Sequence, residues 1–403
     1  MSEKMKAYRI VEWEHPPELT EAPVPVPGPG EVLVKVAGNG LCHSDVGMAL
    51  APAAFMEPLG WRVPFTLGHE VGGYIEALGS GATGFEVGDA VAVVSPHSCG
   101  HCIWCARGQD NNCDDSIVGR GYGIDGGLAR YVLVATTREL VKLQTLDPVI
   151  AGPLTDAGAT SYHAVKRTLP RIPPGGTAVV IGAGGLGAYA IQHLLALTSA
   201  RVVAVDVSPD RLAYATELGA HDVLEGVNDD TTTEIHRLLG GGANAVFDFV
   251  GIDQTITHGL QSTSKAGAYA LVGAGNGTLR GTMFDKLPRD GEVFSFQAPT
   301  IADTLEVIAL AESGKLRVDV DIFPLDRVAE AYEKMERGEL RGRAVVIPDG
   351  FVQNTQSPSV CRYGVACKSS TRRSINFPSC SRSSGVHSIS ARDSCAPRTR
   401  SKR

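Results

Sequence analysis

The sequence predicts an α/β protein with a doubly wound parallel sheet and a second, mostly β domain. From Thr177 onward, strands alternate with helices, whereas residues 5–153 consist of short strands broken by turns. The chain has 403 residues, which exceeds the usual size of a single domain. We therefore expect two domains that share a cleft.

The first domain is predicted over residues 1–152. Strands are expected at 31–36 and 90–94, because both are rich in valine and are bounded by the turn sequences Pro-Gly-Pro-Gly and Val-Gly-Asp. A helix is expected over residues 156–167, and it ends near a segment rich in proline and glycine. This helix leads into the second domain.

The second domain is predicted over residues 153–298. Its alternating pattern is typical of a parallel sheet with helices on both faces. We expect a helix beyond Thr300 and a closing strand at 343–347, so that residues 299–350 return to the first domain. The expected strands are 178–181, 201–206, 245–249 and 269–272, and the expected helices are 186–197 and 210–218.

Composition excludes several classes of protein. A net charge of -7 argues against binding to nucleic acid or to an anionic membrane surface. No apolar run follows the charged start, so we expect no signal peptide. Residues 178–197 are apolar, but four glycines and a strand–turn–helix pattern argue against a membrane span. We expect a cytoplasmic protein whose nine cysteines are ligands or free thiols.

The C-terminal residues 351–403 differ from the rest of the chain. They are rich in serine and arginine, poor in acidic residues, and have no apolar periodicity. This composition favours a disordered tail over a basic segment that binds nucleic acid or a partner. The abrupt change after Asp349 also suggests out-of-frame translation, which resequencing of codons 348–350 tests; an intact reading frame would rule it out.

Four cysteines lie close together in the first domain. Their spacing is Cys-x2-Cys-x2-Cys-x7-Cys, and four thiolates on one loop can close a tetrahedral zinc site that leaves no position for substrate. Iron–sulfur clusters also use four cysteines, but their usual spacings differ. Reduced thiols without a metal are the remaining alternative. We predict a structural zinc site formed by Cys99, Cys102, Cys105 and Cys113.

A second group of residues suits a catalytic zinc ion. Cys42 and His69 each follow a turn, and a catalytic site would add one more protein ligand and an open position. Ser44 could relay a proton, and Asp45 could orient His69 through its second ring nitrogen. Taken singly, Cys42 and His69 could instead be core residues.

A glycine-rich turn follows the strand 178–181 and opens a helix. This context is what a dinucleotide phosphate site requires, with the pyrophosphate at the helix N-terminus. Asp206 follows about 20 residues on, where its carboxylate can accept bonds from ribose hydroxyls and repel a 2′-phosphate. This favours NAD over NADP. Arg211 could support the same ribose or be a surface arginine. The residues of the turn are Gly182, Gly184, Gly185, Leu186 and Gly187.

Together these motifs resemble the medium-chain zinc alcohol dehydrogenase family. Residues 68–79 are similar to its zinc signature, with Glu70, Gly73 and Gly79 in place, and the four-cysteine loop is similar to its structural-zinc lobe. The resemblance covers residues 5–348. It implies a GroES-like catalytic domain, a Rossmann domain, NAD, and two zinc ions per chain.

The resemblance also assigns the catalytic ligands. Cys42 and His69 would bind zinc, and Asp156 stands where the family often has a cysteine; some bacterial secondary alcohol dehydrogenases that the chain resembles also have aspartate there. A carboxylate carries the same charge as a thiolate. Asp156 could instead be stabilised by a helix N-terminus. Glu70 would either support the zinc ligands without binding the metal or bind the zinc transiently.

Further contacts follow from the same resemblance. Arg343 would contact the pyrophosphate, with Arg341 as the nearby alternative, and Thr160 would pack against the nicotinamide. His43 would approach the phosphates or be an exposed turn histidine. One departure is Gly47, where many members have the histidine that ends the proton relay.

The predicted reaction is hydride transfer between a hydrophobic secondary alcohol and its ketone. A primary alcohol, an aldehyde or a polyol is the alternative substrate. A zinc-free quinone or enone reductase would lack the zinc residues, and a non-catalytic nucleotide-binding protein would not explain them. We expect a homodimer or homotetramer that binds a small molecule. Apolar residues that could line the pocket, or belong to the core, are Met48, Phe55, Trp61 and Phe296.

Overall fold

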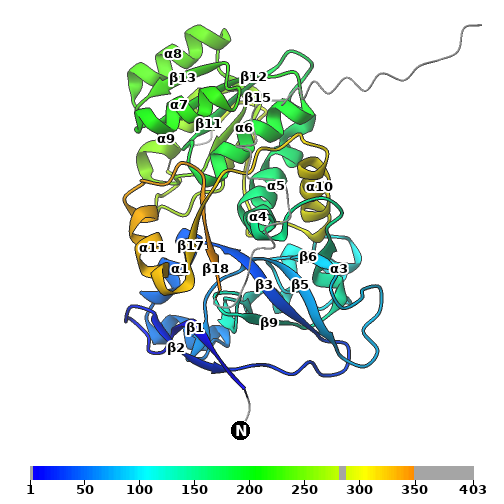
Figure 1. Ribbon diagram of the computed structural model, residues 1–403. Coiled ribbons are helices and arrows are strands. Elements are labelled where there is room, and N and C mark those ends of the chain that lie inside the picture. Colours follow the sequence, from blue (N-terminus) through cyan, green and yellow to red (C-terminus); the bar gives the residue numbers. More distant parts are fainter. Residues whose placement is uncertain (1–2, 281–286, 349–403) are drawn as a thin grey trace, which may run out of the picture. The chain divides into compact units, whose positions relative to one another are not determined.

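The computed structural model describes residues 3–280 and 287–348, and the structural statements below concern these residues. The predicted tail at 351–403 lies outside them. Figure 1 shows a parallel sheet with helices in one part of the chain and largely antiparallel sheets in the other. The predicted fold class is confirmed.

The parallel sheet has six strands in the order β13-β12-β11-β14-β15-β16. The order reverses between β11 and β14, and ligands bind outside the carboxyl ends of the strands at such a switch point. The strands are β11 (Thr177–Ile181), β12 (Arg201–Asp206), β13 (Asp222–Glu225), β14 (Ala243–Asp248), β15 (Thr263–Leu271) and β16 (Glu292–Ser295).

Helices pack on this sheet because its strands are apolar on both faces. Alternate residues of β11 illustrate this, since Ala178 and Val180 belong to one core cluster and Val179 and Ile181 to another. Side-chain caps begin two of the helices: Ser208 accepts from the backbone of Arg211, and Asn228 accepts from Thr231. The helices are α6 (Gly185–Leu197), α7 (Pro209–Glu217), α8 (Asp229–Leu239) and α9 (Asp253–Ser262). Helix α10 (Ile301–Glu312) instead packs in a separate core cluster with Leu154 and Tyr162.

The other sheets form the catalytic domain, and their longest strands are β3 (Val32–Gly40) and β5 (Glu70–Leu78). The main sheet has the order β10-β6-β5-β3-β18-β17, and β9 also pairs with β3. The closing strand β18 (Arg343–Ile347) thus lies beside β3, on the far side from β5. The remaining strands are β1 (Lys4–Ile10), β2 (Glu18–Pro23), β4 (Phe65–Thr66), β6 (Ala90–Val93), β7 (Gly119–Arg120), β8 (Gly123–Ile124), β9 (Tyr131–Val134), β10 (Leu140–Lys142) and β17 (Val320–Pro324).

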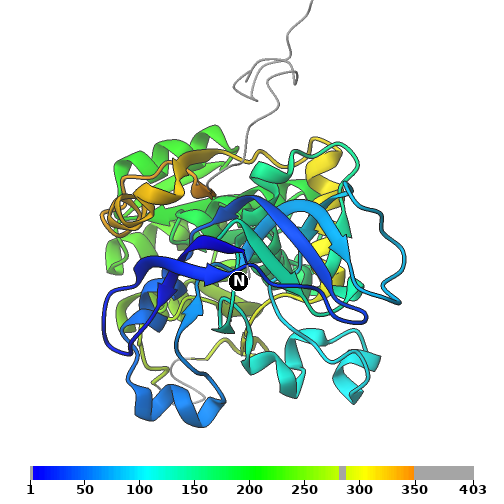
Figure 2. The same cartoon turned by 60° about the horizontal axis from the view of Figure 1, so that its bottom comes forward.

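Short helices complete this domain. In Figure 2 the blue strands near the N-terminus come forward, with the orange helix α11 (Val328–Glu336) on one side and the yellow helix α10 on the other. The others are α1 (His43–Ala49), α2 (Ala53–Met56) and α3 (Ile103–Ala106), with 3-10 turns at Glu57–Leu59, Asp110–Asn112, Asp114–Ile117, Thr137–Glu139, Leu169–Arg171 and Leu325–Arg327.

The helical run that links the two domains is longer than predicted. It starts at Pro148 with α4 (Pro148–Pro153), where the Asp147 carboxylate caps the helix by accepting from the backbone of Val149. A π-helix (Leu154–Gly158) and α5 (Ala159–Thr168) follow. A Cβ on Gly152 would lie 2.2 Å from the carbonyl oxygen of Glu70, so only glycine allows this close packing on β5.

No helix among the described residues is both long enough and apolar enough to span a membrane. The apolar segment 178–197 divides into β11, the glycine turn and α6, as its glycines predicted.

Candidate functional site

Three predicted zinc ligands from three elements converge at one point. Cys42 precedes α1, His69 precedes β5, and Asp156 lies in the π-helix. The Asp156 Oδ2 atom is 3.6 Å from the Cys42 Sγ atom and 3.5 Å from the His69 Nε2 atom. Together with Glu70, these residues place four potential ligand atoms within 4.8 Å of one another.

The separations fit a tetrahedral zinc ion. With bonds of about 2.3 Å to sulfur and about 2.1 Å to nitrogen and oxygen, the S···O edge would be about 3.6 Å and the N···O edge about 3.4 Å. Burial alone would raise the pKa of Asp156, but the hydrogen bond and charge of His69, together with the Arg343 charge, hold that pKa at about 2. The carboxylate is therefore ionised, as a metal ligand must be.

Asp156 does not lie at a helix N-terminus. It is the third residue of the π-helix and follows the six residues of α4. Because α4 precedes the π-helix without a break, this position argues against the alternative that a helix dipole explains the carboxylate.

Asp45 holds both neighbouring ligands in place. Its Oδ2 atom accepts hydrogen bonds from the backbone of Cys42 at 3.1 Å and from the Tyr332 hydroxyl at 2.9 Å. Its Oδ1 atom lies 3.2 Å from the His69 Nδ1 atom, and both side chains are completely buried. The Nε2 atom of His69 therefore faces Asp156 and Cys42. A carboxylate that holds one ring nitrogen so that the other can bind a metal is common in metal sites.

Glu70 lies against the ligands and is paired with Arg343. The Arg343 Nη2 atom donates to the Glu70 Oε1 atom, whereas Oε2 has no hydrogen-bond partner among the described residues. Burial raises the pKa of Glu70 although Arg343 opposes this. A Cβ on Gly40 would lie 2.0 Å from Oε2, so glycine is required where β3 passes this carboxylate.

Ser44 faces the same centre. Its Oγ atom is 3.5 Å from the His69 Nε2 atom and 3.4 Å from the Tyr122 hydroxyl. The Tyr122 ring lies 4.5 Å from the His69 ring, and burial raises the pKa of Tyr122, so its hydroxyl keeps its proton. Sequence reasoning missed Tyr122, because its only signal is a turn between Gly121 and Gly123, which both have positive φ.

The four cysteines of residues 99–113 form a second potential metal site. The Sγ atoms of Cys99 and Cys105 are 4.0 Å apart, and those of Cys102 and Cys113 are 3.8 Å apart. Zinc–sulfur bonds of about 2.3 Å give tetrahedral edges of about 3.8 Å. Hydrogen bonds lower the pKa of Cys99 to about 6, and the largest effect comes from the backbone of His101. The geometry matches a closed four-thiolate site.

The glycine turn brings β11 against the start of α6. A Cβ on Gly187 would lie 1.9 Å from the carbonyl oxygen of Gly182, which itself has a φ of +85°. Asp206 ends β12, where its carboxylate accepts from the backbone of Ala183 at 2.8 Å and of Ser208 at 2.9 Å. Gly184, Gly185 and Leu186 complete the turn.

Positive charge surrounds this turn. Arg211 lies 3.9 Å from the Asp206 carboxylate, and a Cβ on Gly185 would lie 2.7 Å from the Arg343 Nη1 atom. Burial lowers the pKa of His43, and the charges of Arg343 and Arg211 lower it further. The region suits the pyrophosphate of a dinucleotide.

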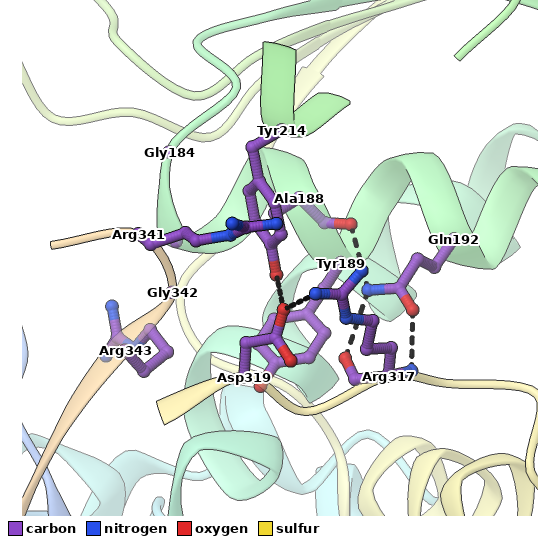
Figure 3. A pocket seen from close by; sticks show the side chains of 11 residues that line it. Gly184, Ala188, Tyr189, Gln192, Tyr214, Arg317, Asp319, Arg341, Gly342 and Arg343 are labelled. Carbon is purple, nitrogen blue, oxygen red and sulfur yellow. Dashed lines mark hydrogen bonds and ion pairs between the residues drawn. The ribbon is translucent and has the colours of Figure 1, made fainter. Parts of the chain in front are cut away.

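Arg341 and Arg343 both line a small cavity beside the glycine turn (Figure 3). It has a volume of about 10 Å³, and around it Tyr214 donates to Asp319, which also pairs with Arg317. Arg341 pairs with Glu217, whereas the Arg343 Nη1 atom would lie 2.7 Å from a Cβ on Gly185. Arg343 is therefore the better candidate for a pyrophosphate contact.

Thr160 lies next to the predicted metal ligand Asp156, since its hydroxyl donates to the Asp156 Oδ1 atom at 3.2 Å. The apolar residues considered for the pocket are dispersed. Met48 and Trp61 belong to a buried core cluster, and Phe55 is 64% exposed. Phe296 packs 4.5 Å from the His163 ring. The core alternative therefore applies to Met48 and Trp61.

Comparison with known proteins agrees with this geometry. Residues 28–145 match the alcohol dehydrogenase GroES-like domain, and residues 185–313 match the zinc-binding dehydrogenase domain. An NAD-dependent alcohol dehydrogenase of Sulfurisphaera tokodaii is 36% identical over 350 residues, which are 85% of this chain and 100% of that protein. The chain belongs to the medium-chain zinc-dependent alcohol dehydrogenase family.

Other members of this alcohol dehydrogenase family differ in substrate. A D-arabinose 1-dehydrogenase (NADP(+)) of Saccharolobus solfataricus is 33% identical, over 86% of this chain and 98% of that protein. The alcohol dehydrogenase structure from Aeropyrum pernix has a TM-score of 0.79 and 34% identity, covering 85% of this chain and 100% of that one. The acetophenone reductase of Geotrichum candidum, solved with NAD, has a TM-score of 0.76 and 30% identity over 86% of this chain and 98% of that one.

Proposed function

We propose that this chain is a zinc-dependent, NAD-linked dehydrogenase that interconverts a hydrophobic secondary alcohol and its ketone. The observation that carries the proposal is the convergence of Cys42, His69 and Asp156 at tetrahedral separations beside the Ser44 hydroxyl. A non-catalytic nucleotide-binding protein would need no such set of donors.

Each residue has a role in this reaction. When bound, zinc and NAD supply a Lewis acid for the substrate oxygen and a hydride acceptor. Cys42, His69 and Asp156 would hold the metal, and Ser44 would accept the hydroxyl proton of the alcohol. Beyond Ser44, Gly47 offers no side chain to continue the relay, and a Cβ added there would meet nothing within 4 Å.

A structural zinc ion would occupy the four cysteines of residues 99–113, which makes two zinc ions per chain. Their sulfur separations and the backbone N–H donors to Cys99 Sγ, Cys102 Sγ and Cys113 Sγ support this proposal. Glu70 would support the catalytic ligands from behind through its pairing with Arg343, or bind zinc transiently through its unpaired oxygen.

The cofactor is NAD. Asp206 is buried at the end of β12 and already tied to the glycine turn, so a 2′-phosphate would meet a fixed negative charge. Thr160 would pack on the nicotinamide, Arg211 would support the ribose, and Arg343 and His43 would face the pyrophosphate. We expect D206G to weaken the preference for NAD over NADP at least tenfold, about 1.4 kcal/mol; unchanged NAD binding would contradict the ribose contact.

The substrate class rests on the residues and on the relatives together. The acetophenone reductase supports an aryl or alkyl ketone, whereas the D-arabinose dehydrogenase supports the polyol alternative. Primary alcohols and aldehydes are the other alternative. We further propose a cytoplasmic homodimer or homotetramer that acts on small molecules and binds neither nucleic acid nor membrane, in accord with the net charge of -7.

The test is NADH formation by zinc-loaded protein with 2-octanol, 1-phenylethanol, 1-octanol and sorbitol in parallel. We expect activity on the first two alcohols and its loss on chelation. Greater activity on sorbitol or 1-octanol would replace the substrate class with the corresponding alternative. If folded, zinc-loaded protein formed no NADH with any of the four alcohols, all of these substrate classes would be rejected.

A further inference from the structure

A buried histidine outside the zinc site contacts the helix that carries Asp156. His193 lies on α6, the helix that begins at the glycine turn, and its exposed fraction is 0%. Its Nε2 atom is 3.0 Å from the carbonyl oxygen of Gly158, the last residue of the π-helix. Its ring packs edge-on against Tyr162, with ring centres 5.1 Å apart, and is stacked 6.4 Å from Tyr189.

The contacts define which ring nitrogen carries the proton. A carbonyl oxygen can only accept, so the Nε2 atom of His193 is the donor. The Nδ1 atom has no hydrogen-bond partner among the residues that the structure describes. Burial also lowers the pKa of His193 to about 4, so the ring is neutral and offers one N–H, directed at Gly158.

The π-helix needs donors of this kind because its turn is wider than an α-helical turn. The backbone of Ala159 bonds five residues back to Leu154, and carbonyls around the wide turn receive side-chain hydroxyls. Thr155 donates to Gly152 at 2.9 Å, and Ser161 donates to Gly158 at 2.9 Å. His193 adds a donor from another helix, so it ties the wide turn to the cofactor domain.

The register of this turn decides where Asp156 points. In an α-helix each residue turns the chain by about 100°, so removing the extra residue of the π-helix would rotate the residues before Gly158 by about that angle relative to α5. The Asp156 carboxylate would then leave the Cys42 Sγ and His69 Nε2 atoms, which are 3.6 and 3.5 Å away. π-helical turns are frequent at functional sites.

We propose that His193 is a positioning residue for the catalytic metal, which holds the π-helix in the register that directs Asp156 toward Cys42 and His69. The proposal rests on the proposed zinc site but not on any substrate. His193 would also connect dinucleotide binding with metal binding. The helix α6 begins at the glycine turn, and His193 lies two turns further along it.

The test compares H193L, which has similar volume but no donor, with H193Q, whose amide can reach Gly158. The affinity of the catalytic site for Zn²⁺ and Co²⁺ is measured by chelator competition, with the four-cysteine site as the internal reference. We expect H193L to bind the catalytic metal 10- to 100-fold more weakly and to show an altered Co²⁺ absorption spectrum. H193Q should stay close to the wild type, and both variants should keep the structural metal.

Each result bears on one claim. Unchanged metal affinity and spectrum in H193L would overturn the role of His193, while the zinc site itself would stand. A wild-type protein that binds metal only at the four cysteines would instead contradict the proposed catalytic site, and the role of His193 with it. Should H193L fail to fold, H193N provides the same comparison with H193Q, because its shorter amide does not reach Gly158; equal metal affinity of these two variants would overturn the proposal.

Discussion

The two proposed metal sites of this chain are built in opposite ways. The four cysteines lie on one loop, and Cys99 and Cys113 are only 14 positions apart. The catalytic ligands come from three elements, and Cys42 and Asp156 are 114 positions apart. The first site can therefore close locally, whereas the second exists only after three elements far apart in the chain have packed together.

This difference extends to the residues that support each site. Backbone N–H groups of the loop itself donate to the sulfur atoms of the four cysteines. The catalytic site instead depends on remote partners: Tyr332 holds Asp45 across 287 positions, and Arg343 holds Glu70 across 273 positions. Distant substitutions should consequently weaken the catalytic site while the loop site is unaffected.

The largest expected effect comes from D156A. Loss of the third ligand should remove the catalytic metal and lower kcat/KM by at least about a thousandfold, since it removes Lewis-acid activation. Metal analysis should find one zinc per chain. D147A is a matched control, because it removes the helix cap of the same run and should cost about 1 kcal/mol of stability but no metal. Two zinc ions per chain in D156A would exclude Asp156 as a ligand.

The substitution C113A tests the local, four-cysteine site. Without four thiolates the loop site should lose its metal, and the free energy of unfolding should fall by several kcal/mol. The loop would also lose its support for α10, because Asp110 accepts from the backbone of Ile301, the first residue of that helix. Urea unfolding measures the effect, with S116A as the control that removes one hydrogen bond of the same loop. A stable C113A protein would show that this site is dispensable for folding.

Acid should weaken the packing behind the catalytic site. The pKa of His193 is lowered to about 4 in the folded state, against about 6.5 for an exposed histidine, so the unfolded chain binds the proton first. The neutral, buried His193 therefore stabilises the folded protein fully above pH 6.5. As the pH falls toward 4, this stabilisation, about 3 kcal/mol, is lost. The difference in unfolding free energy between pH 7.5 and 4.5 should be smaller in H193Q than in the wild type by most of that amount. Equal pH dependence would show that His193 titrates normally in the folded protein.

The smallest expected effect comes from G47H. The position lies on α1, and an added Cβ meets nothing within 4 Å, so a side chain can begin there without a clash. A proton acceptor near Ser44 should raise kcat less than tenfold and add a group with a pKa near 6.5 to the pH–rate profile. G47A controls for the change in helix propensity. A profile identical to that of G47A would mean that proton release does not limit the rate.

Local patterns predicted much of the fold. The strands Arg201–Asp206 and Arg343–Ile347 begin and end where the apolar runs predicted them, and the glycine turn leads into α6 one residue earlier than predicted. These elements depend on short-range properties, namely β-branched runs and glycine positions. The linking helix was predicted only in part, because its beginning at Pro148 and its π-helical turn depend on packing against β5.

The sequence by itself determined the fold class, the glycine turn and the four-cysteine spacing, because these are local features. It gave the proposed catalytic ligand Asp156 only through the family resemblance. Tertiary structure alone decided that Tyr122 faces Ser44, that Arg343 pairs with Glu70, and that His193 reaches Gly158. These contacts join residues far apart in the chain, and no local periodicity encodes them. The physical reason is that buried polar atoms need hydrogen-bond partners, and only the packing of distant segments determines which partners lie within reach.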